Sequence, residues 1–350
     1  MSEFENFDPN GVGVKGTLFG LPFNEENASL ILIPVPWEVT VSYGAGTAEG
    51  PMNILDCSTQ VDLFSPEIKD AWKMGLAMLE IDPVIQETSY KLRTLALEYI
   101  QEQEMGDDDV DENRNVSDTP SRVDEGSLQM IKWVREKAAN FFSLGKMVGL
   151  IGGDHSTPLG LIEALCSKYN DIGILQIDAH ADLRKAYEGF TYSHASIMYN
   201  AMQNENISKL VQVGVRDFSE DEYLFINNSG GRITSFFDSD LRDRIRNCES
   251  WKAISTDIIN ELPENVYISF DIDGLDPRLC PGTGTPVPGG LEFDMAISLI
   301  RDVSLSGRKI IGFDLVEVGA HPWDGNVGAR LLYNLCNWMG VSQKKLTPAT

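Results

Sequence analysis

Short apolar runs alternate with amphipathic stretches along this 350-residue chain, and this alternation restricts its fold more than any other feature. The runs carry apolar side chains at successive positions, so strands built from them would be buried on both faces. We interpret as strands the runs 29–34, 147–151, 172–177, 210–215, 266–270 and 310–313. Helical spacing predicts helices near 90–104, 125–144, 158–169 and 293–304. Alternating βα units of this kind predict a mainly parallel sheet covered by helices on both faces.

Polar clusters follow three of the predicted strands directly. The clusters are Gly152-Gly153-Asp154-His155, Asp178-Ala179-His180-Ala181-Asp182 and Asp271-Ile272-Asp273-Gly274-Leu275-Asp276. In open parallel sheets, functional sites form beyond the carboxyl ends of the strands. We therefore expect the three clusters to meet at one edge of the sheet.

The residue types in these clusters predict a metal site. Asp178, His180 and Asp182 are spaced by two residues, so extended chain would turn all three side chains toward one cavity. Asp271 and Asp273 repeat the spacing. So many carboxylates repel one another unless cations neutralise them. Histidine and aspartate without cysteine suit Mn²⁺, with Ni²⁺, Co²⁺ and Zn²⁺ as competitors, and bridging carboxylates can hold two ions about 3.5–4 Å apart.

The clusters and two later segments resemble the ureohydrolases, the family of arginase, agmatinase, guanidinase and formimidoylglutamase. The matching segments are GGDHS, DAHAD, SFDIDGLDP, PGTGTP at 281–286 and GGL at 289–291. The resemblance extends over about 29–339. It implies a three-layer α/β/α sandwich with a mainly parallel eight-stranded sheet, two Mn²⁺ ions, and a homo-oligomer, commonly a trimer or hexamer.

The resemblance also implies roles for individual residues. His155 and Asp182 would bind one metal, His180 and Asp273 the other, and Asp178 and Asp271 would bridge the two. Asp154 and Asp276 would orient ligands or form turns. Glu317 would bind the guanidinium group of a cationic substrate. His194 would be a proton shuttle to the leaving amine, a task suited to the ordinary histidine pKa near 6.5. His321 would lie at the rim or be structural.

The segment between Asp182 and His194 favours agmatine as the substrate. Residues 183–193 (LRKAYEGFTYS) depart from the arginase pattern and resemble one branch of agmatinases. Arg184 is also similar to a formimidoylglutamase residue, and guanidinases share many of these motifs, so guanidine, arginine and formimidoylglutamate stay open as substrates. A metal-binding scaffold without activity is a further alternative. Five aromatic residues could wall the pocket: Trp37, Tyr43, Phe190, Tyr192 and Trp323.

Composition excludes some classes of partner. The net charge of −25 makes nucleic acid an unfavourable partner. No apolar stretch reaches the ~18 residues of a membrane span, the acidic start of the chain does not resemble a secretory signal, and the five cysteines are scattered, which suits a cytoplasmic protein. We expect a single domain over 1–350, with an N-terminal extension at 1–28 and an acidic, flexible surface insertion at 106–124.

Overall fold

The computed structural model describes residues 7–105 and 118–349. Its centre is an eight-stranded sheet in the order β3-β1-β4-β9-β8-β5-β6-β7, and every neighbouring pair is parallel. The strands are β1 Leu30–Val35, β3 Leu76–Met78, β4 Met147–Gly152, β5 Ile172–Ile177, β6 Ile207–Val213, β7 Ile233–Phe236, β8 Asn265–Asp271 and β9 Lys309–Val316. A small antiparallel pair joins β2 (Ile68–Lys69) to β10 (Thr347–Pro348).

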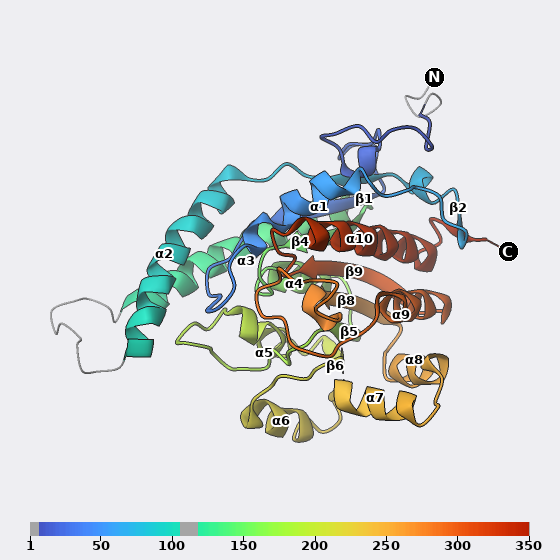
Figure 1. The fold of residues 1–350 in the computed structure, drawn as a ribbon. Helices are drawn as coiled ribbons and strands as arrows, with labels where there is room; N and C mark the ends of the chain where they lie inside the picture. Colours follow the sequence, from blue (N-terminus) through green and yellow to red (C-terminus); the bar gives the residue numbers. More distant parts are fainter. Residues whose placement is uncertain (1–6, 106–117, 350) are drawn as a thin grey trace.

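Helices cover both faces of this sheet, so the chain folds as a three-layer α/β/α sandwich (Figure 1). One layer contains α1 Gly50–Ser58, α7 Asp238–Arg246, α8 Trp251–Asn260, α9 Phe293–Leu305 and α10 Pro322–Ser342. The other contains α2 Pro83–Met105, α3 Thr119–Ser143, α4 Leu159–Cys166, α5 Ile197–Ala201 and α6 Glu220–Asn227.

Alternation along the strands divides the apolar residues between the two layers. In β1, Leu30 and Leu32 belong to the core under α1 and α10, while Ile31 and Ile33 belong to the core under α3 and α4. All four side chains are fully buried. Because successive strand residues point to opposite faces, a continuous apolar run satisfies both cores at once. The predicted parallel sheet is confirmed.

The sequence did not reveal the two edge strands of the large sheet. β3 has only three residues, and β7 (ITSF) is partly exposed at three of its four positions. The start of α3 also differs from the prediction, which placed 119–124 in the acidic insertion. The helix begins at Thr119, with Pro120 in its first turn, so 119–124 are helical. The remaining part of the predicted acidic insertion, 106–117, lies outside the described residues.

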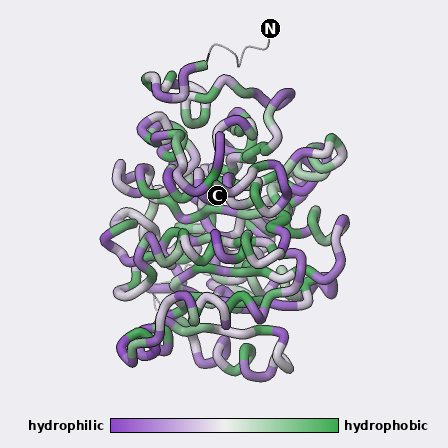
Figure 2. The backbone as a smooth tube through the Cα atoms, turned by 90° about the vertical axis from the view of Figure 1, so that its right-hand side faces the viewer, coloured by the Kyte–Doolittle hydropathy of each residue, from purple (hydrophilic) through white to green (hydrophobic). Residues whose placement is uncertain are grey.

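The described N-terminal residues pack onto the body of the molecule. Phe19 is buried and its backbone N–H donates to Ser58 Oγ on α1 at 2.8 Å. Figure 2 shows this segment beyond one end of the layered body, while the C-terminus faces the viewer near the middle. Within the described residues, no helix has the length and apolarity that a membrane span requires.

Candidate active site

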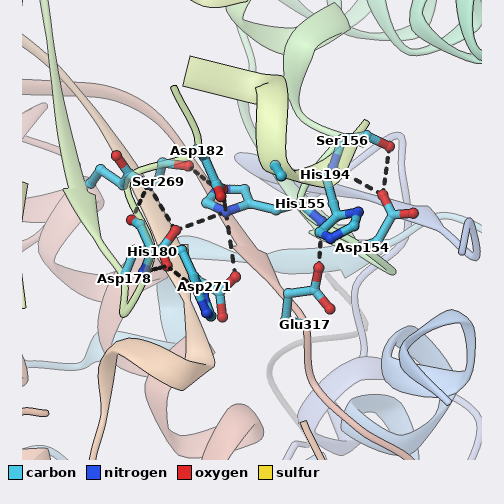
Figure 3. Close-up of polar contacts among 12 residues, drawn as sticks. Asp154, His155, Ser156, Asp178, His180, Asp182, His194, Ser269, Asp271 and Glu317 are labelled. Carbon is cyan, nitrogen blue, oxygen red and sulfur yellow. Dashed lines mark hydrogen bonds and ion pairs between the residues drawn. The ribbon is translucent and has the colours of Figure 1, made fainter. Parts of the chain in front are cut away.

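Four neighbouring strands at the centre of the sheet carry the predicted site. β4 leads to His155, β9 to Glu317, β8 to Asp271 and Asp273, and β5 to the segment that begins at Asp178. All four strands are parallel, so their carboxyl ends open on the same edge. This brings together side chains that are up to 162 residues apart in sequence (Figure 3).

His155 lies at the centre of a buried group of carboxylates. Its Nδ1 is 3.0 Å from Asp178 Oδ2, 2.9 Å from Asp182 Oδ2 and 3.4 Å from Asp271 Oδ2. All four residues are buried. In spite of these short separations, Nδ1 makes no hydrogen bond of acceptable geometry. A nitrogen that faces three carboxylate oxygens in this way is suited to share a cation with them.

His180 is at the centre of a second group. Its Nδ1 lies 3.1 Å from Asp273 Oδ2 and 3.6 Å from Asp178 Oδ1. Asp273 Oδ2 is buried and, like the nitrogen of His155, has no hydrogen-bond partner. Potential ligand atoms lie within 4.8 Å of one another in two overlapping sets, one of His155, Asp178 and Asp271 and one of His180, Asp178 and Asp273. Asp178 belongs to both groups, one oxygen facing each histidine. The donor set therefore fits two adjacent metal ions that share a carboxylate.

The crowding of acids shifts their protonation. Burial, with the nearby charge of Asp178, raises the pKa of Asp182 to about 7. Burial, with the charges of Asp273 and Asp178, raises the pKa of Asp271 well above its ordinary value. Burial alone would lower the pKa of His155, but its carboxylate neighbours outweigh burial and raise that pKa strongly. The metal-free site thus retains protons that bound cations would displace.

Buried polar side chains orient the metal-facing groups from behind. The other ring nitrogen of His155, Nε2, lies 2.9 Å from Ser269 Oγ, which contacts Asp314 Oδ2 at 2.9 Å. Tyr267 donates its hydroxyl to the same carboxylate at 2.7 Å. These contacts fix the ring of His155 with Nδ1 toward the carboxylates. Outer hydrogen bonds of this kind set the orientation and basicity of metal ligands.

Asp178 has a similar support on the β5–β6 side. Gln176 Nε2 donates to its Oδ2 at 2.7 Å, and Gln212 Nε2 donates to Gln176 Oε1 at 2.7 Å. Ser235 Oγ in turn contacts Gln212 Oε1 at 2.6 Å. Asp178, Gln176 and Gln212 are fully buried. This chain of amides holds Asp178 in place between the two histidines.

Glu317 lies beside the carboxylate cluster. Its Oε1 accepts the backbone N–H of His155 at 2.8 Å, and its own N–H donates to Gly153 O at 2.8 Å. Burial, with the charge of Asp154, raises its pKa well above the ordinary value. The residue has a φ of 59°, and Asp182 has a φ of 53°. Left-handed backbone at two non-glycine residues costs about 1–3 kcal/mol each and is common at functional sites.

His194 begins a short 3₁₀ turn after β5 and lines the same cavity. Its Nδ1 lies 3.1 Å from Thr40 Oγ1 and 3.3 Å from Ser193 Oγ. Burial, with the nearby imidazoles of His180 and His155, lowers its pKa to about 3. The structure therefore differs from the expectation of an ordinary histidine pKa: in the resting site this imidazole is neutral.

The cavity over the cluster has a volume of about 380 Å³. Of the five aromatic residues predicted to wall it, only Tyr43 lines it. Trp37 and Phe190 are buried in the core, and Tyr192 and Trp323 also lie outside the lining. Its other aromatic walls are Tyr187 and Phe218.

Charged side chains form another wall of the cavity. Arg184 lies 3.7 Å from Glu222 and places its guanidinium 4.9 Å from the ring centre of Tyr187. Asp217 also lines the cavity and is exposed. Arg184 is thus balanced by Glu222, and Asp217 leaves this wall with an excess of negative charge.

Gly153 allows the loop after β1 and the loop after β4 to come into contact. A Cβ at this position would lie 1.9 Å from Trp37 O, an impossible contact. The loop after β1 therefore packs directly on the loop after β4, and Asp154 joins them: its Oδ2 accepts the backbone N–H of Val39 at 3.1 Å. Asp154 thus holds the two loops together through this hydrogen bond. Asp276 forms a turn and pairs with Arg278.

His321 is structural rather than part of the cavity lining. Its Nδ1 accepts the backbone N–H of Trp323 at 3.1 Å and so caps the first turn of α10. The side chains that sequence reasoning missed include Ser269, Thr40, Asp217 and Glu222. The sequence could have revealed Ser269 and Asp217, since each lies at or just after the end of a predicted strand. Nothing in the sequence pairs Thr40 with His194.

Comparison with known families agrees with this geometry. The family model described as "Arginase family" matches residues 28–336. The chain belongs to the arginase family. It is a hydrolase that acts on linear amidine C–N bonds.

Curated relatives and solved structures are similar to most of this chain. An N(1)-aminopropylagmatine ureohydrolase of Thermus thermophilus is 29% identical over 84% of this chain and 83% of its own length. An agmatinase of Bacillus subtilis is 28% identical over 84% of both chains. The crystal structure of agmatine ureohydrolase of Thermoplasma volcanium has 22% identity and a TM-score of 0.67, covering 98% of both chains. The last likeness concerns the fold alone.

Proposed function

We propose that this protein hydrolyses agmatine to putrescine and urea with a pair of Mn²⁺ ions. The observation that carries the proposal is one cavity that combines the double His/Asp cluster, the Glu317 carboxylate and an acidic wall containing Asp217. A guanidinium at one end and an ammonium at the other match these two acidic regions.

The metal ions would be held by the six residues of the two groups: His155, Asp178, His180, Asp182, Asp271 and Asp273. When bound, such a pair lowers the pKa of a water molecule, so that it becomes a nucleophile near neutral pH. In the overall reaction the water oxygen bonds to the guanidinium carbon and the bond from this carbon to the alkylated nitrogen breaks. Both water protons end on the departing amine.

Glu317 would hold the guanidinium. One of its oxygens accepts the N–H of His155, which leaves the second to accept from the substrate. A cation beside this carboxylate would favour the charged form and reverse the effect of burial on its pKa. Asp182 or Asp178 would hold the nucleophilic water by hydrogen bonding, and His194 would act on the departing nitrogen from the cavity wall.

The acidic wall favours agmatine over a substrate with a distal carboxylate. A curated guanidinobutyrase of Pseudomonas aeruginosa is 31% identical over 232 residues, so this alternative has support from a relative. Arg184 would be the partner for a carboxylate, but Glu222 already lies 3.7 Å from it. The aminopropylagmatine ureohydrolase of Thermus thermophilus and the agmatinase of Bacillus subtilis cover more of the chain, and both names imply cationic substrates.

An assay of urea, ammonia and formamide release tests the proposal directly. The protein is supplied with Mn²⁺, or separately with Ni²⁺, and presented with agmatine, arginine, guanidinobutyrate, guanidine and formimidoylglutamate. Agmatine should give the highest kcat/KM, with urea and putrescine in equal amounts. The Asp217→Asn variant should lose part of its preference for agmatine over guanidinobutyrate.

Each other outcome assigns a different function. Urea from arginine alone would refute the choice of substrate, as would ammonia with urea from free guanidine alone. Formamide from formimidoylglutamate alone would also refute this choice. Metal binding without release of urea, ammonia or formamide from any compound would leave a metal-binding scaffold as the better interpretation.

A further inference from the structure

The His194 ring is anchored on one side by two hydroxyl groups. Thr40 Oγ1 lies 3.1 Å from its Nδ1, and Ser193 Oγ lies 3.3 Å from the same nitrogen. Thr40 is buried, and it comes from the loop after β1, 154 residues before His194. The anchored nitrogen is therefore Nδ1, and Nε2 is the ring nitrogen left for the cavity that His194 lines.

The hydrogen bonds of the two hydroxyl groups determine which nitrogen carries the proton. Thr40 Oγ1 already accepts the backbone N–H of His194 at 3.3 Å, and Ser193 Oγ already accepts that of Ala195 at 3.3 Å. Each hydroxyl then has its single hydrogen to donate. Among the described residues, Nδ1 is the acceptor that the structure places beside both. The single lone pair of Nδ1 accepts one of these hydrogens, and Thr40 Oγ1 is the nearer donor. A protonated Nδ1 would instead leave both hydroxyl hydrogens without an acceptor among the described residues.

We infer that Thr40 is a positioning residue that holds His194 as the neutral tautomer with its hydrogen on Nε2, directed at the departing nitrogen of the substrate. This inference rests on the proposed hydrolysis of a guanidino compound for its catalytic meaning. The tautomer itself does not depend on which substrate is used.

The position of Thr40 is itself strongly fixed. The guanidinium of Arg93 on α2 donates to the backbone carbonyls of Val39 and Val41, on either side of Thr40. The N–H of Val39 donates to the buried carboxylate of Asp154, in the loop that also carries His155. The hydroxyl of Thr40 is thereby tied both to α2 and to the metal-side loop, which gives it little freedom to turn away from His194.

The hydrogen on Nε2 can donate to the alkylated nitrogen of the substrate only after water has added to the guanidinium carbon. The nitrogens of a guanidinium ion share their lone pairs with the central carbon and accept hydrogen bonds poorly. After water adds to that carbon, the alkylated nitrogen becomes tetrahedral and its lone pair can accept the Nε2–H. An interaction of this kind stabilises the transition state more than the bound substrate, so it raises kcat with little effect on KM.

Nitrogen-15 NMR of the imidazole rings measures the tautomer without any substrate. The chain has four histidines, and a His194→Ala variant assigns the signals of His194 by their loss. The protein is supplied with diamagnetic Zn²⁺ so that the metal does not broaden the signals. A pyridine-type, unprotonated signal is expected at Nδ1 in the wild type and in Thr40→Ser. The Thr40→Val/Ser193→Ala variant should show a mixture of tautomers.

Kinetics with the Mn²⁺-loaded protein test the positioning role. Thr40→Val removes the hydroxyl at nearly constant volume and should lower kcat about tenfold, the worth of one hydrogen bond, with KM changed less than about threefold. Thr40→Ser should restore most of kcat. A pyridine-type signal at Nε2 in the wild type would overturn the inference. So would a Thr40→Val variant with the kcat of Thr40→Ser. Cleavage of none of the guanidino compounds would instead refute the proposed function, and the NMR result would still decide the tautomer.

Discussion

Glu317 is the residue that we propose binds the guanidinium group of the substrate. It is buried, it has one oxygen committed to the N–H of His155, and it lies against the carboxylate cluster without belonging to either metal-binding group. Its role can therefore be separated from metal binding, which is not true of Asp178 or Asp271. A change at this position should alter substrate binding in a protein that still holds its metals.

The Glu317→Gln variant makes this separation measurable. Glutamine retains an oxygen for the N–H of His155 but loses the negative charge, so kcat/KM for agmatine should fall by roughly 10- to 100-fold. Metal content, measured by elemental analysis, should stay at the wild-type level. The matched control is Glu163→Gln on α4, a partly exposed carboxylate outside the cavity lining, which should leave kcat/KM unchanged. A Glu317→Gln protein with wild-type kinetics would exclude the residue from substrate binding.

At the scale of elements, α2 and α3 support the segment that precedes His194. On α3, Asp124 Oδ1 accepts the backbone N–H of Thr191 at 2.9 Å and that of Tyr192 at 3.4 Å. On α2, Tyr99 packs edge-on against Phe190, with ring centres 5.6 Å apart. The two helices thus fix the 183–193 segment from outside the sheet. Phe190, expected in the pocket wall, packs against α2 instead.

Removal of the α3 contact should loosen the 183–193 segment. Asp124→Ala leaves two backbone N–H groups without their acceptor, at a cost of about 1–3 kcal/mol. We expect kcat/KM to fall about three- to tenfold, and trypsin to cut faster after the exposed Lys185. Asp124→Asn keeps an acceptor oxygen and should behave nearly as the wild type. Equal trypsin sensitivity of the alanine and asparagine variants would contradict this support.

The same elements show how far sequence reasoning can reach. Strands with apolar residues on both faces, such as β1 and β5, were predictable because burial on both sides requires such a pattern. We could also predict that the polar residues after these strands lie close together, because the carboxyl ends of parallel strands open on the same edge of the sheet. The partnership of Thr40 with His194 did not follow, since it depends on how the loop after β1 meets the segment after β5 in the folded chain. The low pKa of His194 was equally hidden, because burial is a property of the folded site.

At the scale of the whole molecule, the site concentrates part of an already large negative charge. The chain carries a net charge of −25, and the buried cluster places four aspartates around two histidines. Bound cations would relieve this repulsion throughout the centre of the sheet, where β4, β9, β8 and β5 meet. The stability of the fold should therefore depend on metal, with the folded state binding the ions and the unfolded chain lacking the site.

Removal of the metals by a chelator should lower the melting temperature of the whole protein. Each ion at 100 times its dissociation constant stabilises the folded state by about 2.7 kcal/mol, which corresponds to roughly 4 °C in a protein of this size. Calorimetric titration of the metal-free protein with Mn²⁺ should also release protons, seen as a heat that varies with the buffer, because His155 and Asp182 must lose protons to bind a cation. Asp182→Asn should bind less metal and show a smaller rise in melting temperature. A melting temperature that is the same with and without bound Mn²⁺ would mean that the cluster is equally stable without the ions, and the metal-site assignment would then lose its physical basis.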